Sequence, residues 1–112
     1  MANVGIIGWG YVGSATGKGF AKNKENKIVW FDKYKKGPHT PLQVVDKSEF
    51  IFICVPTPMF RDYSGMDMSI VKNVVGEIVP KLVGSDKIVI IKSTVLPGTT
   101  ASLAKKFAKV NF

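Results

Sequence analysis

The chain has 112 residues, enough for one domain but too few for a dinucleotide-binding domain joined to a substrate domain. A hydrophobic share of 46% beside a charged share of 21% excludes a disordered or fibrous protein. The net charge of +8 would suit an anionic partner, but the lysines are scattered and no aromatic-rich recognition motif accompanies them, so we expect a solvated basic surface and no nucleic-acid partner.

The first predicted strand, residues 3–7, runs directly into the stretch Gly8-Trp9-Gly10-Tyr11-Val12-Gly13 and a helix at 11–23. In this context a Gly-x-Gly-x-x-Gly pattern favours dinucleotide binding over a purely structural turn. Its three glycines allow a tight turn, a close approach of backbone to a pyrophosphate, and close packing of the helix. Trp9 either shields the pyrophosphate or packs on the surface. The glycines also interrupt the apolar run, and no later run has membrane-spanning length, so we expect a cytoplasmic protein without a membrane partner.

The second predicted strand, residues 27–31, ends at an acidic residue, Asp32. Asp32 follows Gly8 by 24 residues, near the ~20 expected for a carboxylate that binds the adenosine ribose. A carboxylate here would repel the 2′-phosphate of NADP, which favours NAD. Lys33, Lys35 and Lys36 weaken that preference, because they could neutralise a phosphate or be solvated loop charges.

The third predicted strand, residues 49–55, stops at the sequence Val55-Pro56-Thr57-Pro58, after a short helix expected at 41–47. Ligands of open α/β sheets bind beyond the carboxyl ends of the strands, so we expect this strand end beside the cofactor. Cys54 is the only cysteine, which excludes an internal disulfide and a metal cluster, and we interpret it as a core residue. His39 is interpreted as a surface histidine.

The second half continues the alternation of helix and strand. Apolar residues at helical spacing predict a helix at 68–82, with Asp67 as its N-cap and Gly84 at its end. A strand at 87–92 leads to Ser93 and Thr94, whose hydroxyls serve either a ligand or the cap of a last helix near residue 98. Residues 110–112 could begin a fifth strand. Together the elements predict an α/β fold, a Rossmann-type doubly wound parallel sheet in a single three-layer domain spanning 1–112.

The motifs Gly-x-Gly-Tyr-Val-Gly, Val-Pro-Thr-Pro and Ser-Thr-Val-x-Pro-Gly-Thr, in this order, resemble the UDP-glucose/GDP-mannose 6-dehydrogenase family over its amino-terminal NAD-binding domain. The resemblance implies an enzyme that oxidises the C6 hydroxyl of a nucleotide sugar to a carboxylate in two NAD-dependent hydride transfers. By resemblance, the cofactor-binding residues are Gly8, Gly10, Tyr11, Val12, Gly13, Asp32, Lys36, Val55, Pro56, Thr57, Ser93 and Thr94. The resemblance also implies a catalytic role for Thr94, which would order water and polar groups around the reacting centre.

The family's catalytic cysteine and its lysine, asparagine and aspartate partners lie in segments after this domain. We therefore expect a fragment or a shortened protein that binds NAD without turnover, with a nucleotide sugar as partner only where the rest of the enzyme is present. A homo-oligomer is compatible with the sequence. Two alternatives remain open: a nucleotide-sensing module without enzymatic activity, and a fragment of an unrelated NADP-dependent reductase.

Overall fold

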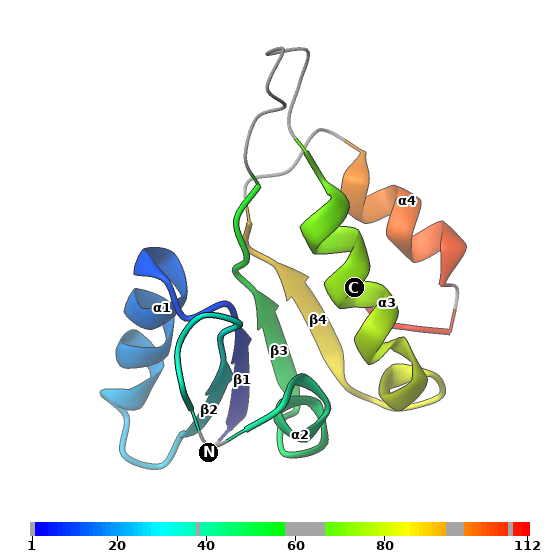
Figure 1. Ribbon diagram of the computed structural model, residues 1–112. Helices are drawn as coiled ribbons and strands as arrows, with labels where there is room; N and C mark the ends of the chain where they lie inside the picture. The colour runs from blue at the N-terminus through cyan, green and yellow to red at the C-terminus, as the bar shows by residue number, and fades with distance from the viewer. Residues whose placement is uncertain (1, 38, 58–66, 94–97, 108) are drawn as a thin grey trace.

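The computed structural model describes residues 2–37, 39–57, 67–93, 98–107 and 109–112 (Figure 1). Strands and helices alternate along these residues. The elements are β1 (Asn3–Ile7), α1 (Tyr11–Ala21), β2 (Lys27–Phe31), α2 (Pro41–Asp46), β3 (Phe50–Ile53), α3 (Ser69–Leu82), β4 (Ile88–Ile91) and α4 (Thr99–Lys106). None of the described helices is both long and apolar enough to cross a membrane.

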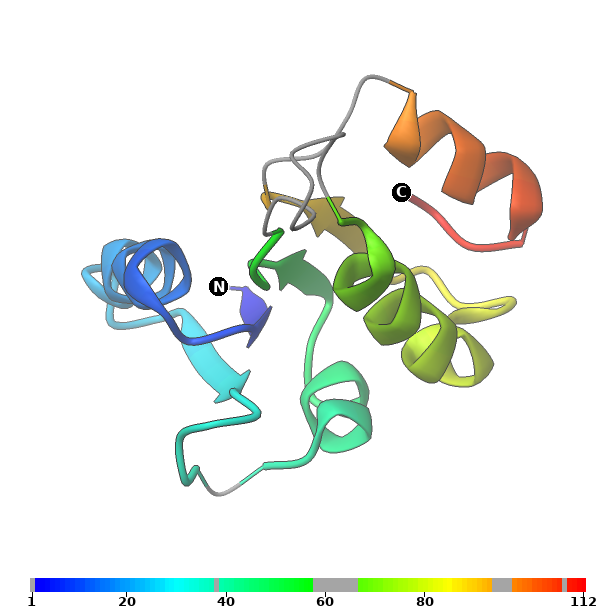
Figure 2. The ribbon, with the colours of Figure 1, turned by 45° about the horizontal axis from the view of Figure 1, so that its top comes forward.

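The strands form one parallel sheet in the order β2-β1-β3-β4. The chain moves from β1 to one edge through β2 and then returns past β1 to β3, so the direction of winding reverses between β1 and β3. Figures 1 and 2 show α1 on one face of the sheet and α2 and α3 on the other. This arrangement confirms the predicted doubly wound α/β fold with three layers.

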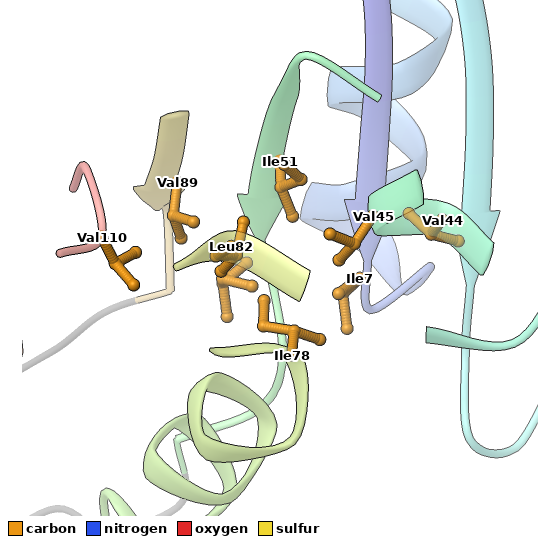
Figure 3. Close-up of a cluster of buried hydrophobic side chains, with 9 residues drawn as sticks. Ile7, Val44, Val45, Ile51, Ile78, Leu82, Val89 and Val110 are labelled. Carbon is orange, nitrogen blue, oxygen red and sulfur yellow. The ribbon is translucent and has the colours of Figure 1, made fainter. Parts of the chain in front are cut away.

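The main core lies between the sheet and the α2 and α3 helices (Figure 3). Period-two alternation turns Ile51 and Ile53 of β3 toward this side, where Ile78 and Leu82 of α3 meet them. Val4 and Ile6 of β1 are also fully buried. Burial on both faces explains why the strands are almost continuously apolar, and it holds their carboxyl ends at a common edge.

Most elements begin and end within two residues of the bounds predicted from the sequence. Two details differ from the sequence-based expectation. Met68, not Asp67, is the N-cap of α3, although an Asp67 carboxylate oxygen accepts a hydrogen bond from the Ser69 N–H at 2.9 Å, which lowers the pKa of that carboxyl. The expected fifth strand is a single parallel bridge between Ile88 and Asn111, in which the Val89 N–H donates to the Asn111 carbonyl at 2.8 Å.

Candidate functional site

Two neighbouring cavities lie at the edge where the strands end. The first, which we call the apolar cavity, measures about 390 Å³. Its lining residues are Ile7, Gly8, Phe31, Asp32, Lys33, Tyr34, Pro41, Val55, Pro56, Ile70, Asn73, Val74 and Glu77. The second, the glycine-loop cavity, measures about 280 Å³. Its lining residues are Gly8, Gly10, Tyr11, Val12, Asp32, Cys54, Val55, Pro56, Thr57, Lys92 and Ser93.

The three glycines of the loop have different surroundings. Gly8 has a φ of 99°, and a Cβ there would lie 2.6 Å from the Cys54 carbonyl oxygen. A Cβ on Gly13 would collide with the Gly8 carbonyl oxygen, so both positions are restricted by the chain's own packing. A Cβ on Gly10 would meet nothing within 4 Å. The space beside Gly10 is therefore open for a group from outside the chain.

The amino terminus of α1 faces this open space. Gly10 is the N-cap of the helix, and the first N–H groups of a helix have no partner within it. These donors and the helix dipole favour an anion such as a pyrophosphate. Gly10, Tyr11 and Val12 all line the glycine-loop cavity, so the geometry fits the anionic centre of a dinucleotide. Gly13 is buried behind the loop and lines neither cavity.

Asp32 borders both cavities and is held in place by backbone donors. Its two carboxylate oxygens accept hydrogen bonds from the N–H groups of Trp9 and Tyr34, both at 2.8 Å. The Gly8 N–H donates to the Phe31 carbonyl at 2.8 Å, which ties the loop to the end of β2. The carboxylate keeps lone pairs for ribose hydroxyls, because each oxygen accepts more than one hydrogen bond.

The lysines after β2 have separate positions. The Lys35 ammonium donates to the Trp9 carbonyl at 2.7 Å, and the Lys33 ammonium lies 5.6 Å from the centroid of the Tyr34 ring. Lys36 is exposed and lines neither cavity. Of these three cations, Lys35 is held by a hydrogen bond within the protein, and Lys33 lines the apolar cavity beside Asp32.

The half-buried Trp9 side chain packs against other residues of the chain. Its ring stacks on that of Trp30, with centroids 4.9 Å apart and an interplanar angle of 16°. The Trp9 ring also lies against Gly17 of α1, where a Cβ would collide with the indole. Trp9 lines neither cavity, so of the two interpretations from sequence, the structure supports surface packing.

The ends of β3 and β4 complete the site. Val55 and Pro56 line both cavities, and Thr57 and Ser93 line the glycine-loop cavity. The Ser93 hydroxyl lies within donating distance of the Val55 carbonyl at 2.8 Å and the Ile53 carbonyl at 3.2 Å. Thr94, for which the sequence suggested a catalytic role, lies outside the described residues.

Cys54 corrects the sequence interpretation. It was expected inside a buried strand, but β3 ends at Ile53, and Cys54 is a half-buried residue that lines the glycine-loop cavity. The reason is that β3 ends at Ile53, although the Cys54 N–H still donates to the Ile7 carbonyl of β1 at 2.8 Å. Partial burial raises the pKa of the Cys54 thiol, and the nearby Lys92 ammonium lowers it to a smaller extent.

His39 also differs from the simple surface residue that was expected. It is half-buried, and its Nδ1 is enclosed with no hydrogen-bond partner among the described residues. Within the same residues, no group of three or more His, Cys, Asp or Glu side chains is placed to hold a metal ion.

Sequence reasoning missed the walls of the apolar cavity. Ile70, Asn73, Val74 and Glu77 share one side of α3 and line the apolar cavity, where Asn73 and Glu77 remain exposed to solvent. Their spacing of three and four residues indicates that they lie on one side of a helix. Only the packing of α3 in the structure shows that this side borders a cavity. Lys92 was also missed as a lining residue, although it is a charged residue directly after a buried strand.

Comparison with protein families gives one match, to the NAD-binding domain of the UDP-glucose/GDP-mannose dehydrogenase family, over residues 39–111. The matched region begins after the glycine loop and Asp32, so the evidence of family membership is independent of the glycine motif. A comparison with curated protein sequences gives no match.

Among solved structures, the chain is similar to GDP-mannose dehydrogenase from Pseudomonas aeruginosa, a ternary complex, with a TM-score of 0.77 and 21% identity over 96% of this chain. It is similar to NDP-N-acetyl-D-galactosaminuronic acid dehydrogenase from Methanosarcina mazei Go1, with a TM-score of 0.74 and 19% identity over 96% of this chain. UDP-N-acetyl-mannosamine dehydrogenase Cap5O from Staphylococcus aureus gives a TM-score of 0.73 and 24% identity over 94%. The alignments cover 33%, 30% and 32% of those three chains, so this chain spans about a third of their length. At these identities the similarity shows a shared fold.

Proposed function

Because this chain belongs to the UDP-glucose/GDP-mannose dehydrogenase family and carries its NAD-binding domain, we propose that it is the cofactor-binding part of a nucleotide-sugar 6-dehydrogenase. In this proposal residues 1–112 form one domain that binds NAD and does not oxidise the sugar by itself. The sugar C6 alcohol would be oxidised to a carboxylate with groups that residues 1–112 do not supply. NAD, when bound, supplies the hydride acceptor, and the protein supplies position and electrostatics.

The observation that carries the proposal is the open space beside Gly10 at the amino terminus of α1, next to the Asp32 carboxylate. The N–H groups of the α1 first turn would hold the pyrophosphate, and Asp32 would accept hydrogen bonds from the adenosine ribose. The apolar cavity would take the adenine ring between side chains such as Val55 and Val74. Thr57 would lie on the adenosine side, and Ser93 would border the nicotinamide half.

Calorimetric titration of the chain with NAD tests the proposal. We expect binding with a dissociation constant between micromolar and millimolar, because the cavity is largely preformed but open to solvent. The absence of heat and of any change in tryptophan fluorescence at saturating NAD would refute it. In the presence of UDP-glucose and NAD we expect no NADH, and measurable turnover would contradict the second half of the proposal.

Asp32→Ala tests the choice of cofactor. In the unmodified chain we expect NAD to bind more tightly than NADP, because the carboxylate repels a 2′-phosphate. The substitution should weaken NAD binding and reduce the ratio of the two affinities by about tenfold, the effect of one charge-assisted hydrogen bond. A preference for NADP in the unmodified chain would favour the reductase alternative instead.

A further inference from the structure

Lys92 is the basic residue of the glycine-loop cavity. Among the described residues that line this cavity it is the one Lys or Arg, and Asp32 is the one carboxylate. Lys92 comes directly after β4 and is exposed. Neither the glycine motif nor the strand-end motifs assign it a role, so the cavity contains a cation whose function is open.

The sheet register brings Lys92 near the first turn of α1. Ile53 of β3 and Ile91 of β4 are partners, and the Lys92 N–H donates to the Ile53 carbonyl at 2.9 Å. Cys54 and Lys92 are therefore neighbours across strands, which lie about 4.8 Å apart. Cys54 in turn lies against α1, since a Cβ on Gly13 would be 3.3 Å from the Cys54 Cβ. The row therefore runs from α1 through Cys54 to Lys92, and Cys54 and Lys92 both line the glycine-loop cavity.

The backbone of Lys92 is held at this place by the next residue. The Ser93 N–H donates to the Ile53 carbonyl at 3.0 Å, and the Ser93 hydroxyl reaches the Val55 carbonyl at 2.8 Å. These bonds attach the end of β4 to the end of β3. By contrast with Lys35, whose ammonium is engaged by the Trp9 carbonyl, the Lys92 ammonium makes no hydrogen bond or ion pair with the described residues.

We propose that the Lys92 ammonium binds a phosphate of the dinucleotide in the glycine-loop cavity, opposite the amino terminus of α1. This inference rests on the proposed function. A pyrophosphate carries two negative charges, whereas a helix terminus provides only about half a positive charge. Lysine binds phosphate as a point charge on a flexible stem, which suits a residue at the rim of an open cavity. Lys92 would then be a binding residue of the cofactor.

The test compares three variants of the full chain: Lys92→Met, which removes the charge with little change of shape; Lys92→Arg, which keeps the charge; and Lys105→Met, a control on the exposed side of α4. Each is titrated with NAD by calorimetry and with adenosine, which lacks phosphate, by NMR. We expect Lys92→Met to bind NAD about tenfold more weakly and adenosine within about twofold of the unmodified chain. Lys92→Arg should bind NAD within about threefold, and Lys105→Met should change neither ligand.

Salt dependence supplies a second readout. Added KCl should weaken NAD binding less in Lys92→Met than in the unmodified chain, because one screened charge has been removed. Equal NAD affinities for Lys92→Met and Lys105→Met would overturn the inference while leaving the proposed function intact. Equal losses for NAD and adenosine in Lys92→Met would overturn it too, since they would indicate a structural effect. Failure of the unmodified chain to bind NAD would refute the proposed function, and this inference with it.

Discussion

The two cavities at the sheet edge share Gly8, Asp32, Val55 and Pro56, and the rest of each comes from a different part of the chain. The glycine-loop cavity is formed by backbone at the start of α1 and by the last residues of two strands, with Lys92 at its rim. The apolar cavity is formed by side chains that are distant in sequence, including Phe31 from β2, Pro41 from α2 and Val74 from α3. The glycine-loop cavity adds the first N–H groups of α1 and the Lys92 ammonium to the shared residues, and the apolar cavity adds apolar side chains such as Phe31 and Val74. A dinucleotide needs both, because its pyrophosphate is anionic and its adenine is flat and largely apolar.

The difference extends to how each cavity tolerates substitution. In the glycine loop, a methyl group added at Gly13 would collide with the chain's own backbone, and one added at Gly10 would enter the space that we propose for the ligand. In the apolar cavity, each side chain contributes a part of the contact surface, so a single change should have a smaller effect. Three experiments, in order of expected effect, test this contrast.

The largest effect is expected from Gly13→Ala, with Gly10→Ala as its matched control. The methyl group at residue 13 collides with the Gly8 carbonyl oxygen, so we expect a loss of about 2–3 kcal/mol in the free energy of unfolding and a Tm lower by roughly 10 °C or more. At residue 10 the methyl group meets nothing within 4 Å. Gly10→Ala should therefore keep the Tm within about 3 °C and weaken NAD binding at least tenfold.

Thermal unfolding followed by circular dichroism, together with calorimetry, separates these outcomes. If Gly10→Ala lowered the Tm as much as Gly13→Ala, the open space beside Gly10 would not exist. If Gly10→Ala bound NAD normally, the pyrophosphate would lie elsewhere.

A moderate effect is expected in the apolar cavity from Ile70→Gln. Ile70 is 37% exposed and is the second residue of α3, and Leu42, 38% exposed, is the second residue of α2 and does not line the cavity. Ile70→Gln removes about 1 kcal/mol of apolar contact with the adenine, so adenosine and NAD should both bind about fivefold more weakly. Leu42→Gln is the control and should change neither affinity. A loss for NAD alone would show that the adenine does not occupy this cavity.

The smallest effect concerns the reactivity of Cys54. Thiolate is the form that reacts with iodoacetamide, and burial raises the pKa of this thiol, so alkylation at pH 7 should be slower than for a small-molecule thiol and should accelerate as the pH rises. Lys92→Met removes the charge that lowers the pKa and should slow alkylation further. Because Cys54 lines the glycine-loop cavity, NAD should protect it. Mass spectrometry of the intact chain measures the alkylation rate as a function of pH, in the Lys92→Met variant and in the presence of NAD. If NAD does not slow alkylation, Cys54 does not lie beside the bound cofactor.

The sequence predicted the fold well because the fold depends on local patterns, and several of the residues that it proposed for the site line the glycine-loop cavity. Strand β1, the glycine loop and α1 are contiguous in the sequence. Pro56 and Ser93 come shortly after β3 and β4, whose short β-branched or aromatic runs predict buried strands. These local patterns bring Gly8, Gly10 and Pro56 to the glycine-loop cavity, whereas Lys92 and Cys54 were not expected there. Cys54 was misplaced because the last pairing residue of a strand depends on its neighbours, and the two prolines mark only the approximate end.

What the sequence determined by itself is the order of elements, the parallel sheet and the use of backbone at the start of α1, since hydrophobic periodicity and glycine sterics act over a few residues. Only the tertiary structure decided which side of α3 borders a cavity, how Trp9 packs, and that Lys35 is engaged while Lys92 faces the glycine-loop cavity. Those outcomes depend on contacts between residues far apart in the chain, which form when the helices pack on the sheet. The same packing brings Lys92, which follows β4, to the cavity beside the glycine loop, which follows β1.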